Sequence, residues 1–170
     1  KSADNPMGFL PGEAGGFIML EDLETAEKRD AKIFGILENA FFVNTEDKRF
    51  SKNYIAGRAL ADSLINVCNT KVKGSKYSIY SNLNGENMRA DEFGKMMILL
   101  PEILRNYVLF HPLVSYGEIG AATEIAAVSE ILQSFNRKYN KADQAVACTS
   151  GENGNKGSVL VKNTGIKNGN

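Results

Sequence analysis

The sequence predicts an α/β protein with a mainly parallel sheet, and two observations carry this prediction. Strand-like apolar runs alternate along the chain with amphipathic helical stretches, as in successive βαβ units. The clearest unit is centred on residues 115–136, where a glycine turn opens into an alanine-rich helix between the strand-like runs 107–112 and 144–148. Ligands of such units bind where strands end and helices begin, so we expect chemistry at 115–122 and above all at Glu118.

The remaining elements follow from apolar periodicity and turn residues. In chain order they are a strand at 17–20 after the glycine-rich turn 8–16, a helix from Asp22 to 30, one long or bent strand at 32–43, a charged loop at 44–52, a helix at 53–69, a turn at 71–76, a strand at 77–80, a helix that Pro101 interrupts, a strand at 107–110, and the closing strands 144–148 and 157–161. The short loop between the last two strands predicts an antiparallel pair. Helices are expected on both faces of the sheet.

Length and charge limit the classes of function. The chain has 170 residues, of which 43% are hydrophobic, enough for one domain with a real core. We assign residues 1–163 to this domain and 164–170 to a loose polar tail. Twenty basic residues balance twenty acidic ones, which argues against nucleic acid or an anionic membrane as a partner. No apolar run approaches the length of a membrane-spanning helix.

Cysteine and histidine usage argues against a metal site. Cys68 and Cys148 form no CxxC motif, and His111 is the single histidine, whereas a structural zinc ion usually takes four such ligands. Two buried thiols in a reducing, cytoplasmic compartment are the simplest interpretation. Cys148 would act as a nucleophile only with a base beside it, and the sequence supplies no obvious one.

Phosphate-binding loops are also disfavoured. The stretch 150–158 is rich in glycine but lacks the GxxxxGK[ST] order and precedes a strand. Residues 117–120 precede a helix, yet they lack the GxGxxG form and place a carboxylate where phosphate would bind. We expect no cofactor.

Three stretches resemble the C-terminal half of the beta-ketoacyl synthases of the thiolase-like superfamily. Residues 5–37 resemble the family segment in which a GFxxGEGAG turn enters a strand, an acidic helix and a second strand. Residues 115–135 are similar to the family's SNxGHTxxAAAG helix, and 150–161 resemble its glycine-rich loop and last strand. The resemblance implies the C-terminal half of a thiolase-like fold, with a mainly parallel five-stranded sheet and a final antiparallel strand.

The resemblance also implies where a site would lie. The family's two catalytic histidines match Asn84 and Glu118, so the usual decarboxylating pair is replaced. A family lysine would fall near Leu113, and a gating phenylalanine near Glu152 or Asn153, which we take as substrate-binding candidates. The implied partners are an acyl carrier protein or acyl-CoA thioester, the N-terminal half of the same fold, and a homo- or hetero-oligomer.

Three functions remain open at this point. The first is a ketosynthase-like protein that acts on acyl thioesters in fatty-acid or polyketide-type synthesis by a changed mechanism. The second is a non-catalytic ketosynthase-like subunit that shapes an acyl pocket or stabilises a catalytic partner. The third is a small-molecule binding module unrelated to thioesters. Glu118 itself has two interpretations, a carboxylate that caps its own helix or one that lines a pocket opposite Asn84.

Overall fold

The computed structural model describes residues 8–45, 57–68 and 76–164, and it contains one five-stranded sheet. The strands lie in the order β1-β5-β4-β2-β3, with β1 at Ile36–Asn44, β2 at Tyr77–Ser81, β3 at Tyr107–Phe110, β4 at Gln144–Ser150 and β5 at Asn155–Lys162. Strand β2 pairs in parallel with β3 and β4, whereas β5 is antiparallel to both β1 and β4. The predicted mainly parallel sheet with a reversed last strand is confirmed.

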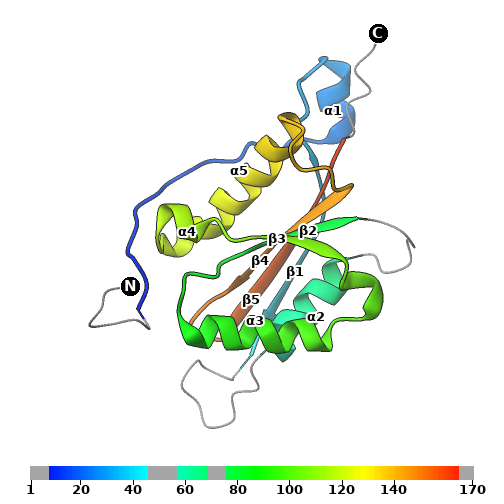
Figure 1. Cartoon of the computed structure of the whole chain (residues 1–170). Helices are drawn as coiled ribbons and strands as arrows, with labels where there is room; N and C mark the ends of the chain where they lie inside the picture. The colour runs from blue at the N-terminus through cyan, green and yellow to red at the C-terminus, as the bar shows by residue number, and fades with distance from the viewer. Residues whose placement is uncertain (1–7, 46–56, 69–75, 165–170) are drawn as a thin grey trace.

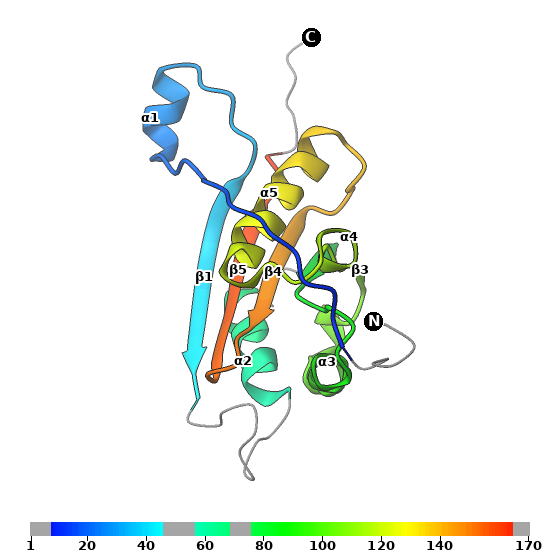
Figure 2. The same ribbon diagram turned by 90° about the vertical axis from the view of Figure 1, so that its left-hand side faces the viewer.

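Helices cover both faces of this sheet, as predicted. The helices of the described residues are α1 (Leu23–Lys28), α2 (Arg58–Val67), α3 (Asn87–Leu99), α4 (Leu113–Tyr116) and α5 (Thr123–Asn136), with 3₁₀ turns at Glu102–Leu104 and Gly120–Ala122. Figure 1 shows α2 and α3 on one face and α5 with α4 on the other. Helix α1 lies beyond the end of the sheet at which β1 begins (Figure 2). None of the helices in the described part of the chain is both long and apolar enough to cross a bilayer.

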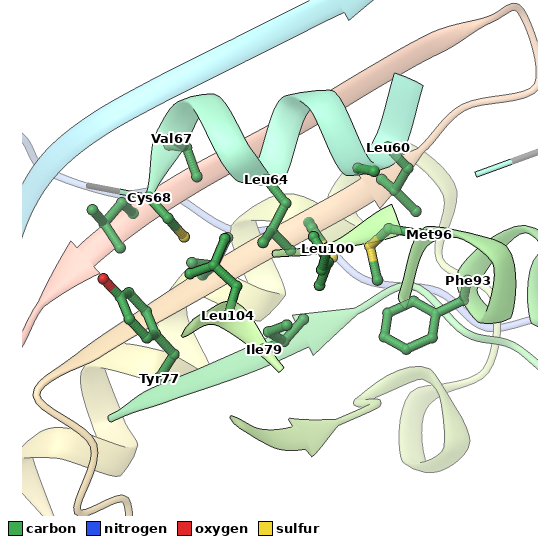
Figure 3. Packing of buried hydrophobic residues seen from close by; sticks show 14 residues of the cluster. Leu60, Leu64, Val67, Cys68, Tyr77, Ile79, Phe93, Met96, Leu100 and Leu104 are labelled. Carbon is green, nitrogen blue, oxygen red and sulfur yellow. The ribbon is translucent and has the colours of Figure 1, made fainter. Parts of the chain in front are cut away.

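Strand β2 shows why the sheet must be covered twice. All five of its residues are buried, and Ile79 packs into the core under α2 and α3 (Figure 3) while Tyr80 packs against α5. Because successive side chains of a strand point to opposite faces, a strand that is buried throughout needs helices on both sides. The two cores follow from this alternation.

The predicted strand at 17–20 is wrong. These residues lie outside the sheet, and Phe17, Met19 and Leu20 are exposed, with Phe17 fully so. An apolar run becomes a strand only where a neighbouring strand takes its backbone hydrogen bonds. The nearest backbone pairing in this segment is a parallel bridge between Pro11 and Glu118.

The predicted helix of residues 115–136 begins later than expected. Glycines interrupt its start, because Gly117 and Gly120 have φ angles of 77° and 59°, outside the right-handed helical region. The regular helix α5 therefore starts at Thr123. The long strand predicted at 32–43 also starts later, at Ile36, and a register shift between Leu37 and Asn39 accounts for its predicted bend.

Some predictions fall partly on residues outside the described ranges. These are the first and last residues of the helix predicted at 53–69, the loop at 46–52, the turn at 71–75, the tail from 165, and residues 5–7 of the first family-like stretch.

Candidate functional site

A cavity of about 530 Å³ opens at the edge of the sheet where the parallel strands end. Phe42 reaches it from the end of β1, Asn84 from the loop after β2, and Thr149 from the end of β4. Glu118 and Gly120 line it from the segment before α5. The location agrees with the expectation that ligands of open α/β sheets bind beyond the carboxyl ends of the strands.

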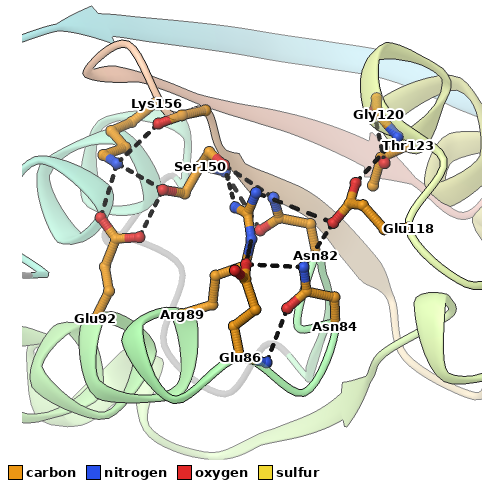
Figure 4. Close-up of polar contacts among 11 residues, drawn as sticks. Asn82, Asn84, Glu86, Arg89, Glu92, Glu118, Gly120, Thr123, Ser150 and Lys156 are labelled. Atoms are coloured by element: carbon orange, nitrogen blue, oxygen red, sulfur yellow. Dashed lines mark hydrogen bonds and ion pairs between the residues drawn. The ribbon is translucent and has the colours of Figure 1, made fainter. Parts of the chain in front are cut away.

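Asn84 and Glu118 meet in this cavity, as Figure 4 shows. The Asn84 side-chain nitrogen donates to Glu118 Oε2 at 2.7 Å, although the residues are 34 positions apart. Strand β2, which precedes Asn84, pairs in parallel with β3, and α5, which follows Glu118, packs against β2 and β4, so the two loops lie together. The two residues chosen from the sequence therefore form one side-chain pair.

Glu118 contacts both the turn ahead of its helix and the cavity, although α5 itself begins at Thr123 and has no side-chain cap. Its Oε1 accepts the backbone N–H of Gly120 at 3.0 Å, at the start of the 3₁₀ turn that leads into α5. Its Oε2 accepts from Asn84. The carboxylate thus caps the turn with one oxygen and lines the cavity with the other, so the two roles do not exclude each other.

Asn84 has no side-chain N–H left for a ligand in this arrangement. Its amide nitrogen has two hydrogens, and it donates to Glu86 Oε2 at 3.0 Å as well as to Glu118. Its Oδ1 accepts the backbone N–H of Glu86 at 3.0 Å. An oxyanion would therefore have to displace a carboxylate to receive a hydrogen bond from Asn84.

Arg89 joins the same network, and the sequence did not single it out beyond a charged helix start. Its Nε donates to Glu86 Oε2 at 3.2 Å, and its Nη2 lies 4.0 Å from Glu118 Oε2. Its Nη1 donates to the carbonyl of Ser150. The side chain is only 12% exposed, so these contacts tie the first turn of α3 to the end of β4.

A buried ion pair lies behind the cavity. Lys156 Nζ is 2.8 Å from Glu92 Oε1, and both side chains are at most 5% exposed. Ser150 lies between them, because its Oγ donates to Glu92 Oε2 and accepts from Lys156 Nζ, each at 2.5 Å. The pair links α3 to the β4–β5 hairpin and was also missed from the sequence, where Glu92 is an ordinary acid of a helix start.

The remaining predicted site residues divide. Glu152 lines the cavity from the β4–β5 hairpin, whereas Asn153, in the same hairpin, is exposed and does not line it. Leu113, at the position of the family lysine, is buried. His111 is exposed and does not line the cavity.

The thiols have no nucleophilic character here. Burial raises the pKa of the Cys148 thiol to about 12, and burial does the same for Cys68. Nearly all of each thiol is therefore protonated at neutral pH. Within the described ranges, no group of three or more His, Cys, Asp or Glu side chains is placed to hold a metal ion.

The fold has counterparts among solved ketosynthases. A ketosynthase in complex with its type II polyketide synthase acyl-carrier protein matches 84% of this chain and 41% of its own, with a TM-score of 0.68 and 14% identity. A beta-ketoacyl synthase from Burkholderia phymatum matches 85% of this chain and 41% of its own, with a TM-score of 0.64 and 9% identity. Ketosynthase twelve of the bacillaene synthase from Bacillus amyloliquefaciens matches 82% and 32%, with a TM-score of 0.62 and 9% identity.

This chain has the thiolase-like fold of half a ketosynthase. The structural likeness confirms the expected fold, that of the C-terminal half of a ketosynthase. The chain spans about two fifths or less of the length of the ketosynthases it matches. No protein-family model matches the sequence, and neither does any curated protein. At these identities the likeness concerns the fold alone.

Proposed function

We propose that this chain supplies the C-terminal half of a ketosynthase-like protein that binds or acts on acyl thioesters of a carrier protein or coenzyme A, in fatty-acid or polyketide-type synthesis. The observation that carries the proposal is the contact between Asn84 and Glu118 in a cavity at the carboxyl edge of a ketosynthase-like sheet. These residues occupy the positions that the resemblance assigns to two catalytic histidines. The cavity is large enough for a small acyl group and part of its arm.

The chemistry of the pair bears on the choice between a changed enzyme and a non-catalytic subunit. Glu118 is able to accept a proton, whereas Asn84 neither accepts nor releases one at neutral pH. An oxyanion needs free N–H donors, and both N–H groups of Asn84 are already bound to carboxylates. This donor count favours the alternative function, a ketosynthase-like subunit that shapes an acyl pocket or stabilises a catalytic partner.

The proposed partner is the other half of the fold. A second hollow, of about 420 Å³, lies between residues 14–16 and the outer side of α5, where Ala126 and Ser129 leave the helix thin. The neighbouring extended segment exposes Phe17, Met19 and Leu20. This surface combines a helix face of small side chains with an extended segment that exposes apolar side chains. A second layer of helix and strand would cover such a surface.

This surface predicts that the isolated chain associates. At high concentration it is expected to sediment as a species heavier than the 18.6 kDa monomer, because association removes these apolar side chains from water. Phe17→Glu combined with Met19→Glu should restore the monomer, while Glu24→Gln on the exposed side of α1 should not. A wild-type chain that stays monomeric at the highest soluble concentration would contradict the prediction.

We also propose that the protein is cytoplasmic. Its two buried cysteines are free thiols, which fit a reducing environment.

Thioester binding tests the proposed function directly. Butyryl-pantetheine, an uncharged mimic of a loaded carrier arm, is expected to bind the chain in an isothermal titration, and pantetheine alone more weakly. Glu118→Ala should weaken butyryl-pantetheine binding at least about tenfold, because it removes the side chain that joins Asn84 to the Gly120 N–H in the wall of the cavity. Asn163→Ala, at the opposite end of the sheet, is the matched control. Absence of binding to the wild-type chain would refute the proposal.

A further inference from the structure

The ionisable side chains that line the cavity are unequal in sign. Among the described residues that line it, four carboxylates, those of Glu86, Glu118, Glu124 and Glu152, face a single guanidinium, that of Arg89. The side chains of Glu118 and Glu86 are 16% and 15% exposed, so little water separates them from a bound ligand. Charges shielded this little interact more strongly than charges on an open surface.

The cation that the described residues bring to this cavity, Arg89, already lies beside two of these carboxylates. Arg89 binds Glu86 through Nε, the Ser150 carbonyl through Nη1, and lies beside Glu118 through Nη2. Recognition of a carboxylate by arginine normally uses two parallel N–H groups of one guanidinium. An incoming carboxylate would have to compete with Glu86 and Glu118 for this guanidinium.

Two neutral donors beside Glu118 are engaged in the same way. Both N–H groups of Asn84 go to Glu86 and Glu118, and the Gly120 N–H goes to Glu118. Around Glu118 the cavity therefore presents carboxylate oxygens to a ligand. Bringing a second negative group next to such oxygens costs free energy, whereas an uncharged acyl group meets no comparable penalty.

We infer that this cavity selects acyl thioesters whose acyl group carries no carboxylate, and that Glu118 is the residue that enforces the selection. The inference rests on the proposed thioester function and adds its substrate class. Malonyl and other dicarboxylic thioesters are rejected because their free carboxylate lies against Glu118 and Glu86. Short, uncharged acyl groups such as butyryl are accepted.

The test compares two probes of similar size on the full chain. Butyryl-pantetheine and malonyl-pantetheine are titrated at pH 7.5, where the malonyl carboxylate is ionised. The butyryl thioester is expected to bind at least about tenfold more tightly. Higher salt should narrow this ratio, since it screens like-charge repulsion.

Variants test whether Glu118 causes the preference for the butyryl over the malonyl thioester. Glu118→Gln keeps an oxygen for the Gly120 N–H and removes the charge, so the ratio should fall to within about threefold. Glu124→Gln, on the same cavity but away from Asn84, should narrow the ratio less, and it provides a reading if Glu118→Gln folds poorly. Glu24→Gln on α1 makes the same substitution at the far end of the sheet and should leave the ratio unchanged.

The outcomes separate the inference from the function beneath it. Binding of both probes with equal affinity, or tighter binding of the malonyl thioester, would overturn the inference and leave the proposed function standing. An unchanged ratio in a folded Glu118→Gln protein would overturn the role of Glu118, and an unchanged ratio in Glu124→Gln as well would overturn the role of the cavity carboxylates. Failure of both probes to bind would overturn the proposed function, and the inference with it.

Discussion

Lys156→Met will lower the free energy of unfolding by about 3 to 5 kcal/mol, the usual cost of removing one partner of a buried ion pair. Glu92 and Lys156 are 2.8 Å apart and 5% and 4% exposed. Without the ammonium group, the Glu92 carboxylate is left in a site that water cannot reach to replace the lost charge. Urea unfolding followed by circular dichroism measures the loss.

Two further variants make this prediction specific. Lys162→Met, also on β5, removes an exposed lysine whose nearest carboxylate, that of Glu38, is 3.8 Å away, and it should cost less than about 1 kcal/mol. The double variant Glu92→Gln, Lys156→Met should recover at least half of the single loss, because no charge remains buried. A Lys156→Met protein as stable as Lys162→Met would show that the pair does not hold α3 to the β4–β5 hairpin.

Gly57→Ala is expected to be the second most damaging change, with a loss of roughly 2 to 5 kcal/mol in the free energy of unfolding. Gly57 precedes α2 with a φ angle of 83°, which residues with a side chain rarely adopt. A Cβ atom there would lie 2.5 Å from the backbone nitrogen of Met96 and 2.7 Å from the carbonyl oxygen of Glu92. Neither backbone atom is able to move without displacing α3.

Gly94→Ala is the matched control for this substitution. Gly94 lies in the middle of α3 on its exposed side, and a Cβ atom there meets nothing within 4 Å. Alanine favours helix more than glycine does, so stability should rise by about 0.5 to 1 kcal/mol. Thermal unfolding of both variants checks that Gly57→Ala lowers the stability and Gly94→Ala raises it. Equal stability of Gly57→Ala and wild type would mean that α2 and α3 do not approach as described.

Much of the fold was predictable because it is written in local patterns. The runs at 77–80 and 144–148 are apolar and bounded by turn residues, and they became the buried strands β2 and β4. Residues 17–20 show the same local pattern and form no strand, since pairing depends on a neighbour that local sequence does not reveal. The strands were therefore predicted correctly wherever another segment of this chain pairs with them.

The site was predicted less completely, for a physical reason. Asn84 and Glu118 were found through a family resemblance, and each stands at a loop after a strand or before a helix. Arg89 and Lys156 carry no such signal, because a lysine in a hairpin or an arginine in a first helical turn is ordinarily solvated. Their burial, and the complete use of Asn84's donors, result from packing between distant segments.

The central claim is that an acyl thioester occupies the cavity that Asn84 and Glu118 line. Chemical-shift mapping with ¹⁵N-labelled chain and butyryl-pantetheine tests it most directly. The account predicts that the largest shifts occur at the side-chain amide of Asn84 and at the backbone amides of Gly120 and Gly157, all of which belong to the cavity. Shifts confined to residues 14–16 and the outer side of α5, with Asn84 and Gly120 unmoved at saturation, would contradict it.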